Sequence, residues 1–134
     1  MPHVVVQYTA NLESEVDMAG LCRDLADALI GLRDEAGGPL FPIGGTRVLA
    51  YPAAAWAVAD GKGDYGFCYI NIRIGAGRSA VKKKEAGDAV LALVQGHFAS
   101  AFENRHIGVT VQIDEGAGQV SDAKHSNLHP LFNR

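Results

Sequence analysis

The order of the predicted elements is the feature that most restricts the fold of this chain. Alternating apolar and polar residues predict strands at 2–9, 46–59, 65–74 and 106–115. Apolar residues at helical spacing fall between the first two strands and again between the last two. We therefore predict an α+β, two-layer fold in which two β-α-β units form a four-stranded mixed sheet with two helices on one face.

The length of 134 residues is that of a single domain. We expect one domain over 1–134, with a repeated pattern at 1–60 and 64–116 and a C-terminal tail at 117–134. The glycine-rich turn DGKGD separates the two units. The units share a pattern of elements and have little sequence identity, as is common for an old internal duplication.

The helix boundaries are predicted from capping residues and from turns. In the first helix, Ser14 and Asp17 have the spacing of a capping box, and glycines at 37–38 are expected to end the helix. The second helix is expected over Ser79–Phe102, with His97 on its buried stripe. Pro52 interrupts its strand, which predicts an edge position because proline has no N–H to donate to a neighbouring strand.

Two helices can cover only one face of the predicted sheet. In the strand at 65–74, Cys68, Ile70, Ile72 and Ile74 alternate with Phe67, Tyr69, Asn71 and Arg73. The first set suits the core. The second set is too apolar to be left entirely in water, so we expect copies of the chain to associate through that face.

The overall charge excludes several classes of function. A formal net charge of −3 argues against a partner such as nucleic acid or an anionic membrane, so an anionic ligand needs a local cluster of Arg or Lys. No apolar stretch is long enough to span a membrane, and we expect a cytoplasmic protein. Cys22 and Cys68 are expected to be buried free thiols in a reducing compartment.

Two arginines and a glycine-rich turn are the candidates for anion binding. The stretch IGAGRSA (74–80) has the spacing of a dinucleotide fingerprint but lacks the acidic residue expected about twenty positions later, so the glycines alone indicate a tight turn. Arg78 directly precedes a helix, whose N-terminus favours an anion, and its guanidinium could bind a carboxylate. Arg47 follows PIGGT at the start of a strand. His125 and His129 lack a third ligand, so we expect no metal site.

Pro2 fits the first position of a strand and also offers a chemical function. Cells generally remove an initiator methionine that precedes a small residue such as proline. Without Met1, the nitrogen of Pro2 would be a secondary amine on a core strand. Desolvation and nearby cations would lower the pKa of this amine, which would make it a general base and then an acid near neutral pH.

Several motifs together resemble one known family. The MPH start, FPIGGTR, ADGKGDYGF, IGAGRS and HSNLHPLF are similar to those of the 5-carboxymethyl-2-hydroxymuconate Δ-isomerases. These belong to the tautomerase superfamily, with 4-oxalocrotonate tautomerase and macrophage migration inhibitory factor. The resemblance covers nearly the whole chain. It implies a homotrimer and cofactor-free proton transfer, with Pro2 as the catalytic residue and with Arg47 and Arg78 binding substrate carboxylates. Leu49 departs from the family, where an arginine is common.

The resemblance leads to an expected function with three alternatives. We expect an isomerase that acts on a small anionic substrate, an unsaturated 2-hydroxy or 2-oxo di- or tricarboxylate from aromatic (homoprotocatechuate) breakdown, without metal or nucleotide cofactor. One alternative is a tautomerase of a smaller 2-oxo acid, which Leu49 favours. A second is a catalytically silent, trimeric ligand-binding protein. A third is nucleotide binding at GAGRSA.

Overall fold

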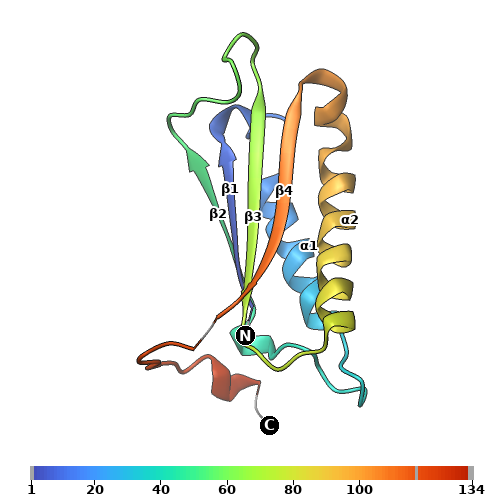
Figure 1. The fold of residues 1–134 in the computed structure, drawn as a ribbon, viewed down its shortest axis with the longest axis vertical. Helices are drawn as coiled ribbons and strands as arrows, with labels where there is room; N and C mark the ends of the chain where they lie inside the picture. The colour runs from blue at the N-terminus through green and yellow to red at the C-terminus, as the bar shows by residue number, and fades with distance from the viewer. Residues whose placement is uncertain (1, 117, 133–134) are drawn as a thin grey trace.

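The computed structural model describes residues 2–116 and 118–132, and Figure 1 shows its two layers. In chain order, the main elements are β1 (His3–Thr9), α1 (Met18–Gly31), β2 (Arg47–Ala53), β3 (Gly66–Ile74), α2 (Ala80–Asn104) and β4 (Ile107–Glu115). Three 3-10 turns accompany them, η1 (Ala10–Leu12), η2 (Ile43–Gly45) and η3 (His129–Leu131). Both helices lie on one face of the sheet (Figure 1), as predicted.

The strand order is β2-β1-β3-β4. β1 runs parallel to β2 and antiparallel to β3, and β3 runs parallel to β4. The sheet is therefore mixed, as the repeated β-α-β pattern predicts, and each parallel pair is joined by one helix. This topology brings the start of β1, the start of β2 and the ends of β3 and β4 to the same end of the sheet.

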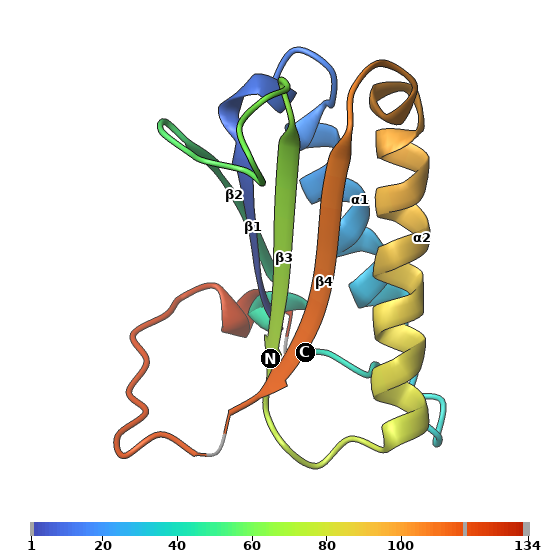
Figure 2. The ribbon, with the colours of Figure 1, turned by 45° about the horizontal axis from the view of Figure 1, so that its top comes forward.

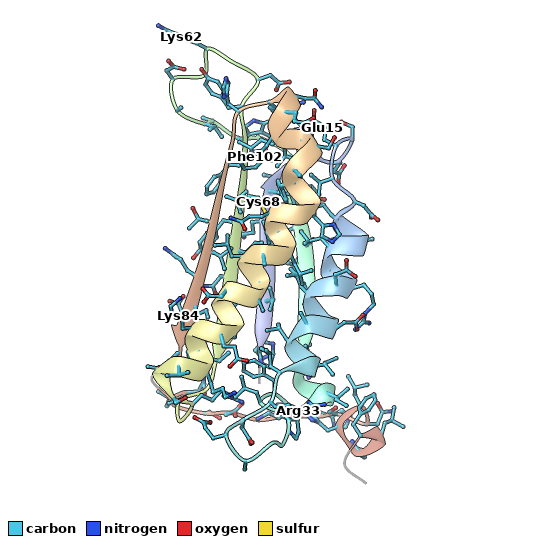
Figure 3. All side chains as sticks on the ribbon, turned by 90° about the vertical axis from the view of Figure 1, so that its right-hand side faces the viewer. Glu15, Arg33, Lys62, Cys68, Lys84 and Phe102 are labelled. Carbon is cyan, nitrogen blue, oxygen red and sulfur yellow. The ribbon has the colours of Figure 1, made fainter. Side chains whose placement is uncertain are left out.

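The core lies between the sheet and the helices. Alternate residues of β1 and β3 are buried against α1 and α2, and Figure 3 shows Cys68 in this layer. The buried residues of the two strands are Val4, Val6, Tyr8, Cys68, Ile70, Ile72 and Ile74. The four residues of β3 are those that the period-two pattern assigned to the core.

The predicted start of the first helix is wrong, and so is its predicted end. The chain forms η1 and a turn, and α1 begins only after Asp17, whose side chain accepts a hydrogen bond from the N–H of Gly20 at 3.0 Å. The cap is therefore Asp17, and Ser14 is not part of it. Past Gly31, the Asp34 carboxylate accepts from the N–H groups of Ala36 and Gly38, which forms a local turn in place of further helix.

The second helix agrees closely with its predicted bounds. Ser79 is its N-cap and accepts a hydrogen bond from the N–H of Lys82 at 3.2 Å. His97 was predicted to lie on the buried stripe but is only partly buried. Its Nε2 lies 2.8 Å from Oδ2 of Asp24, an exposed residue of α1. Among the described residues, no helix combines the length and the apolar character needed to cross a bilayer.

The face of the sheet that points away from the helices carries exposed apolar side chains. We call it the outer face, and Leu49, Tyr51 and Phe67 are each between 38% and 52% exposed there. β2 is an edge strand, as Pro52 predicts. Cys68 is a buried free thiol, but Cys22 is only partly buried, because it lies at the margin of the helix layer.

The end of the sheet nearer the β2–β3 turn is closed by a polar cluster. Arg105 Nε donates to Glu15 Oε2 at 3.0 Å and also forms an ion pair with Asp64. The amide of Asn11 donates to Asp64 Oδ1 at 3.0 Å. The hydrogen bond from Asn11 and then that from Arg105 hold the pKa of the Asp64 carboxyl below its ordinary value. This end is therefore fixed by structural ion pairs.

Candidate active site

The opposite end of the sheet gathers side chains that are far apart in the sequence. His3 of β1 pairs in register with Arg47 of β2 on one side and with Arg73 of β3 on the other. After β4 the chain passes beneath this end, so that η3 contacts η2 just before Arg47. Figure 2 shows this C-terminal segment, residues 118–132, looping out and returning to the sheet.

A pocket of about 470 Å³ opens between the strand ends and the C-terminal segment. We call it the cationic pocket, because its charged lining consists of Arg47, Arg73, Lys124 and one acid, Asp122. Asp122 is neutralised by Lys124, whose Nζ lies 2.7 Å from its Oδ2. The local cluster of cations that an anionic ligand requires in this acidic chain is therefore present.

The field of these cations acts on His3. Partial burial of the imidazole lowers its pKa, and the charge of Arg47 lowers it further, followed by those of Arg73 and Lys124. The charges that would attract an anion thus also favour the neutral form of His3. The direction of the shift supports the view that the three cations share one site.

Pro2 and Arg47 lie together. Pro2 is buried at the entrance to β1, and its carbonyl accepts a hydrogen bond from the N–H of Arg47 at 3.2 Å. Pro2 is not among the described residues that line the cationic pocket, but its chain neighbour His3 is. Met1 lies outside the described residues, so its predicted removal is not addressed by this geometry.

Arg78 lies apart from the other two predicted residues. Its Nε donates to the carbonyl of Leu40 at 3.1 Å, its Nη1 donates to that of Gly75 at 3.2 Å, and its guanidinium carbon lies 4.6 Å from the centre of the Phe41 ring. It lines a separate hollow with Asp34 and others. Since Gly75 lines the cationic pocket, Arg78 is adjacent to that pocket but does not open into it.

Of the described lining residues, Arg47 was a predicted site residue, and the others were not, among them Arg73, Lys124 and His129. His129 Nε2 is buried and has no hydrogen-bond partner among the described residues. The ring packs on Gly44, where a Cβ would lie 3.2 Å from Nδ1 and 3.1 Å from His129 Cα. The absence of a side chain at Gly44 of PIGG therefore allows the C-terminal segment to approach. Only alternation along β3 could have placed Arg73 from the sequence.

The mixed sheet with two helices on one face defines a protein of the tautomerase fold. A fused 4-OT trimer matches it with a TM-score of 0.53 at 15% identity, over 98% of both chains, which shows the fold alone. The chain belongs to the 5-carboxymethyl-2-hydroxymuconate isomerase family, whose model matches residues 2–132. The resemblance seen in the sequence motifs is therefore confirmed.

Individual relatives agree with this assignment. A 5-carboxymethyl-2-hydroxymuconate Delta-isomerase of Escherichia coli is 32% identical over 98% of this chain and 99% of its own length. A crystal structure of a 5-carboxymethyl-2-hydroxymuconate delta-isomerase has a TM-score of 0.94 at 46% identity, covering 100% of this chain and 94% of that one. The crystal structure of a 5-carboxymethyl-2-hydroxymuconate isomerase from Deinococcus radiodurans R1 has a TM-score of 0.86 at 33% identity. The match covers 99% of this chain and 95% of that one. The chain is accordingly an isomerase.

Proposed function

We propose that this chain isomerises 5-carboxymethyl-2-hydroxymuconate, or a similar unsaturated 2-hydroxy or 2-oxo acid of aromatic catabolism, by proton transfer without a cofactor. The observation that carries the proposal is the cationic pocket beside Pro2, in a chain with a net charge of −3. A polycarboxylate suits this lining, since the pocket offers three cations and only one acid. The relatives' names supply the particular substrate.

The reaction assigns one base and one acid step to Pro2. With Met1 removed, the Pro2 amine takes the proton of the substrate's 2-hydroxyl group. The oxygen lone pair forms the C2=O bond, the C2=C3 pair moves to C3=C4, and the C4=C5 pair takes a proton at C5 from the Pro2 ammonium. Protons and electrons balance, and the amine is regenerated.

Arg47 and Arg78 are assigned to the carboxylates and to the developing dienolate charge. Arg47 lines the cationic pocket and is bonded through its backbone to Pro2, so it is placed to act near the reacting oxygen. Arg78 faces a separate hollow within one chain. Its contact with substrate therefore requires that assembly bring a neighbouring copy's pocket to that hollow.

We assign the outer face to a homotrimer. A groove of about 460 Å³ on this face is lined by aromatic side chains, among them Tyr51, Trp56, Phe67 and Tyr69. An apolar surface of this kind is buried more favourably between copies than in water. The fused 4-OT protein of the same fold is described as a trimer. The free thiols of Cys22 and Cys68 favour a cytoplasmic location.

The test is Pro2→Ala, because alanine also permits methionine removal but supplies a primary amine. We expect kcat/KM for dienol isomerisation to fall roughly 10²–10⁴-fold. The reaction is measured by the decrease in dienol absorbance. Lys62→Ala, in the exposed turn at the other end of the sheet, is the control and should keep its activity. Unchanged activity in Pro2→Ala would contradict the role of proline. So would full activity in protein whose intact mass shows that Met1 is retained.

A further inference from the structure

Arg73 is an exposed cation near the end of β3, and its backbone is paired with strands on both sides. It pairs in register with His3 of β1 and with Asp114 of β4. Its guanidinium lies over Gly116, where a Cβ would be 3.7 Å from Nη2 and 3.9 Å from Nε. The strand register therefore sets where this side chain begins, and its guanidinium lies beside Gly116 at the wall of the cationic pocket.

Within the described part of the chain, the Arg73 guanidinium has no acidic partner. Asp114, the register partner on β4, accepts a hydrogen bond from the Asn71 amide at 2.7 Å. Over residues 2–116 and 118–132, no carboxylate lies within ion-pair distance of Arg73. A cation that lines a pocket without a protein counter-ion is suited to an anionic ligand.

The C-terminal segment neutralises Asp122, which among the described lining residues is the charge that would oppose such a ligand. Asp122 lines the cationic pocket and would repel a carboxylate. The ion pair with Lys124 at 2.7 Å neutralises it, and both side chains are about half exposed, 58% for Asp122 and 48% for Lys124. The two residues on the segment therefore set how strongly the pocket attracts an anion.

We propose that Arg73 binds one carboxylate of the substrate in the cationic pocket. Lys124 permits this binding by neutralising Asp122. Together, Arg73 and Lys124 make the pocket select a tricarboxylate over a dicarboxylate. The catalytic part of this inference rests on the proposed isomerase function. The anion-binding part does not, because it follows from the lining of the pocket alone. Arg73 contributes binding energy and takes no part in proton transfer.

The kinetic test compares 5-carboxymethyl-2-hydroxymuconate, with three carboxylates, and 2-hydroxymuconate, with two. Arg73→Gln should raise KM for the tricarboxylate about tenfold or more, as loss of a charged hydrogen bond does, while kcat and the KM for the dicarboxylate change little. Arg73→Lys keeps the charge without the fork and should recover part of the loss. Arg23→Gln on the exposed surface of α1 is the matched control and should change neither KM.

Variants of the exposed segment test the sign of the effect. Asp122→Asn frees Lys124 and should lower KM for the tricarboxylate, whereas Lys124→Gln unmasks Asp122 and should raise it. Even if Arg73→Gln fails to fold, these two substitutions test whether the charges of Asp122 and Lys124 control KM for the tricarboxylate. Equal losses with both substrates in Arg73→Gln, or the same direction of change in Asp122→Asn and Lys124→Gln, would overturn the inference.

A binding measurement separates this inference from the proposed function. Calorimetric titration with tricarballylate, which has three carboxylates, and glutarate, which has two, requires no turnover. If the enzyme does not isomerise the muconates but Arg73→Gln loses tricarballylate binding, the function is wrong and the carboxylate site stands. If the enzyme isomerises the muconates, but Arg73→Gln leaves the ratio of the two KM values and the binding of tricarballylate unchanged, the proposed function stands. The carboxylate site at Arg73 is then wrong.

Discussion

The two faces of strand β3 differ in nearly every physical respect although they share one backbone. Toward the helices, Ile70 and Ile72 are completely buried. Away from the helices, Phe67 is 38% exposed, Asn71 is hydrogen-bonded to Asp114, and Arg73 lines the cationic pocket. The core face keeps the chain folded. The outer face carries exposed apolar side chains along most of its length, which we propose for association, and a cation at one end, which we propose for anion binding.

The difference shows how a single strand can serve stability and function without conflict. Side chains alternate between the faces, so a substitution on one face leaves the packing of the other largely intact. Substitutions at neighbouring positions of β3 should therefore have separable effects. The following experiments would break this separation or sharpen it.

The largest effect is expected on the core face. Ile70→Ala leaves a cavity between the sheet and the helices, and should lower the free energy of unfolding by about 2–5 kcal/mol. The neighbouring outer-face variant Asn71→Ala loses the side-chain hydrogen bonds to Asp114 and Tyr69 at the solvent-facing surface and should cost about 1 kcal/mol. Urea unfolding at a single protein concentration measures both. Similar losses in the two variants would show that the faces are not energetically distinct.

Thiol chemistry reports on the same core face. Burial raises the pKa of the Cys68 thiol from 9.0 to about 12, so its thiolate fraction at pH 8 falls by roughly three orders of magnitude. The pKa of the partly buried Cys22 is also raised by burial. In a thiol assay of native protein at pH 8, Cys22 should react first and Cys68 only after denaturation. Rapid reaction of native Cys68 would indicate that the core opens.

A smaller effect is expected on association. Phe67→Lys places a charge on the outer face and should weaken self-association about tenfold or more, equivalent to about 1.4 kcal/mol. Phe102→Lys is the matched control, since Phe102 is 53% exposed on α2, in the other layer. Sedimentation velocity over a dilution series distinguishes them. Dissociation in Phe102→Lys with an intact trimer in Phe67→Lys would place the interface on the helices.

The smallest effect is a change in proton affinity at the sheet end. Removing the charge in Arg73→Gln should raise the pKa of His3 toward its ordinary value, because Arg73 is one of the cations that lower it. NMR titration of the imidazole measures the shift. In the wild type, the pKa of His3 is lower in the folded state than in the unfolded state, so the unfolded state takes up the imidazole proton at a higher pH. The free energy of unfolding should therefore decline as pH falls below about 6.5. If the pKa of His3 is unchanged in Arg73→Gln, the charge of Arg73 does not act on His3, which contradicts the placement of both residues in one pocket.

Most of the fold could be predicted from periodicity. The alternation in β1 and β3 is clear because one face is fully buried, and the crossover pattern fixed two parallel pairs. The start of α1 was mispredicted because Ser14 and Asp17 are both plausible caps, and only the three-dimensional course of η1 selects Asp17. The end of α1 depends on Asp34, whose side chain satisfies the backbone locally.

The site was less predictable because it is assembled from distant segments. Pro2 and Arg47 were named from their motifs, and the structure brings them together through one backbone hydrogen bond. Arg78 was named in the same way but is bonded to main-chain carbonyls outside the cationic pocket. Lys124 and His129 lie in a segment without periodic pattern, so no sequence signal indicates where it packs. Their places depend on the contact between η3 and η2.

The course of the chain has a practical consequence for handling the protein. The start of β1 and η3 both lie at the end of the sheet that holds the cationic pocket, while the turn that carries Lys62 lies at the other end (Figures 1 and 3). A dye, affinity handle or surface linker attached to either of these two segments would therefore sit beside the pocket. One inserted in the turn at 59–64 would leave the pocket open, and a chain immobilised there would direct it toward the solution.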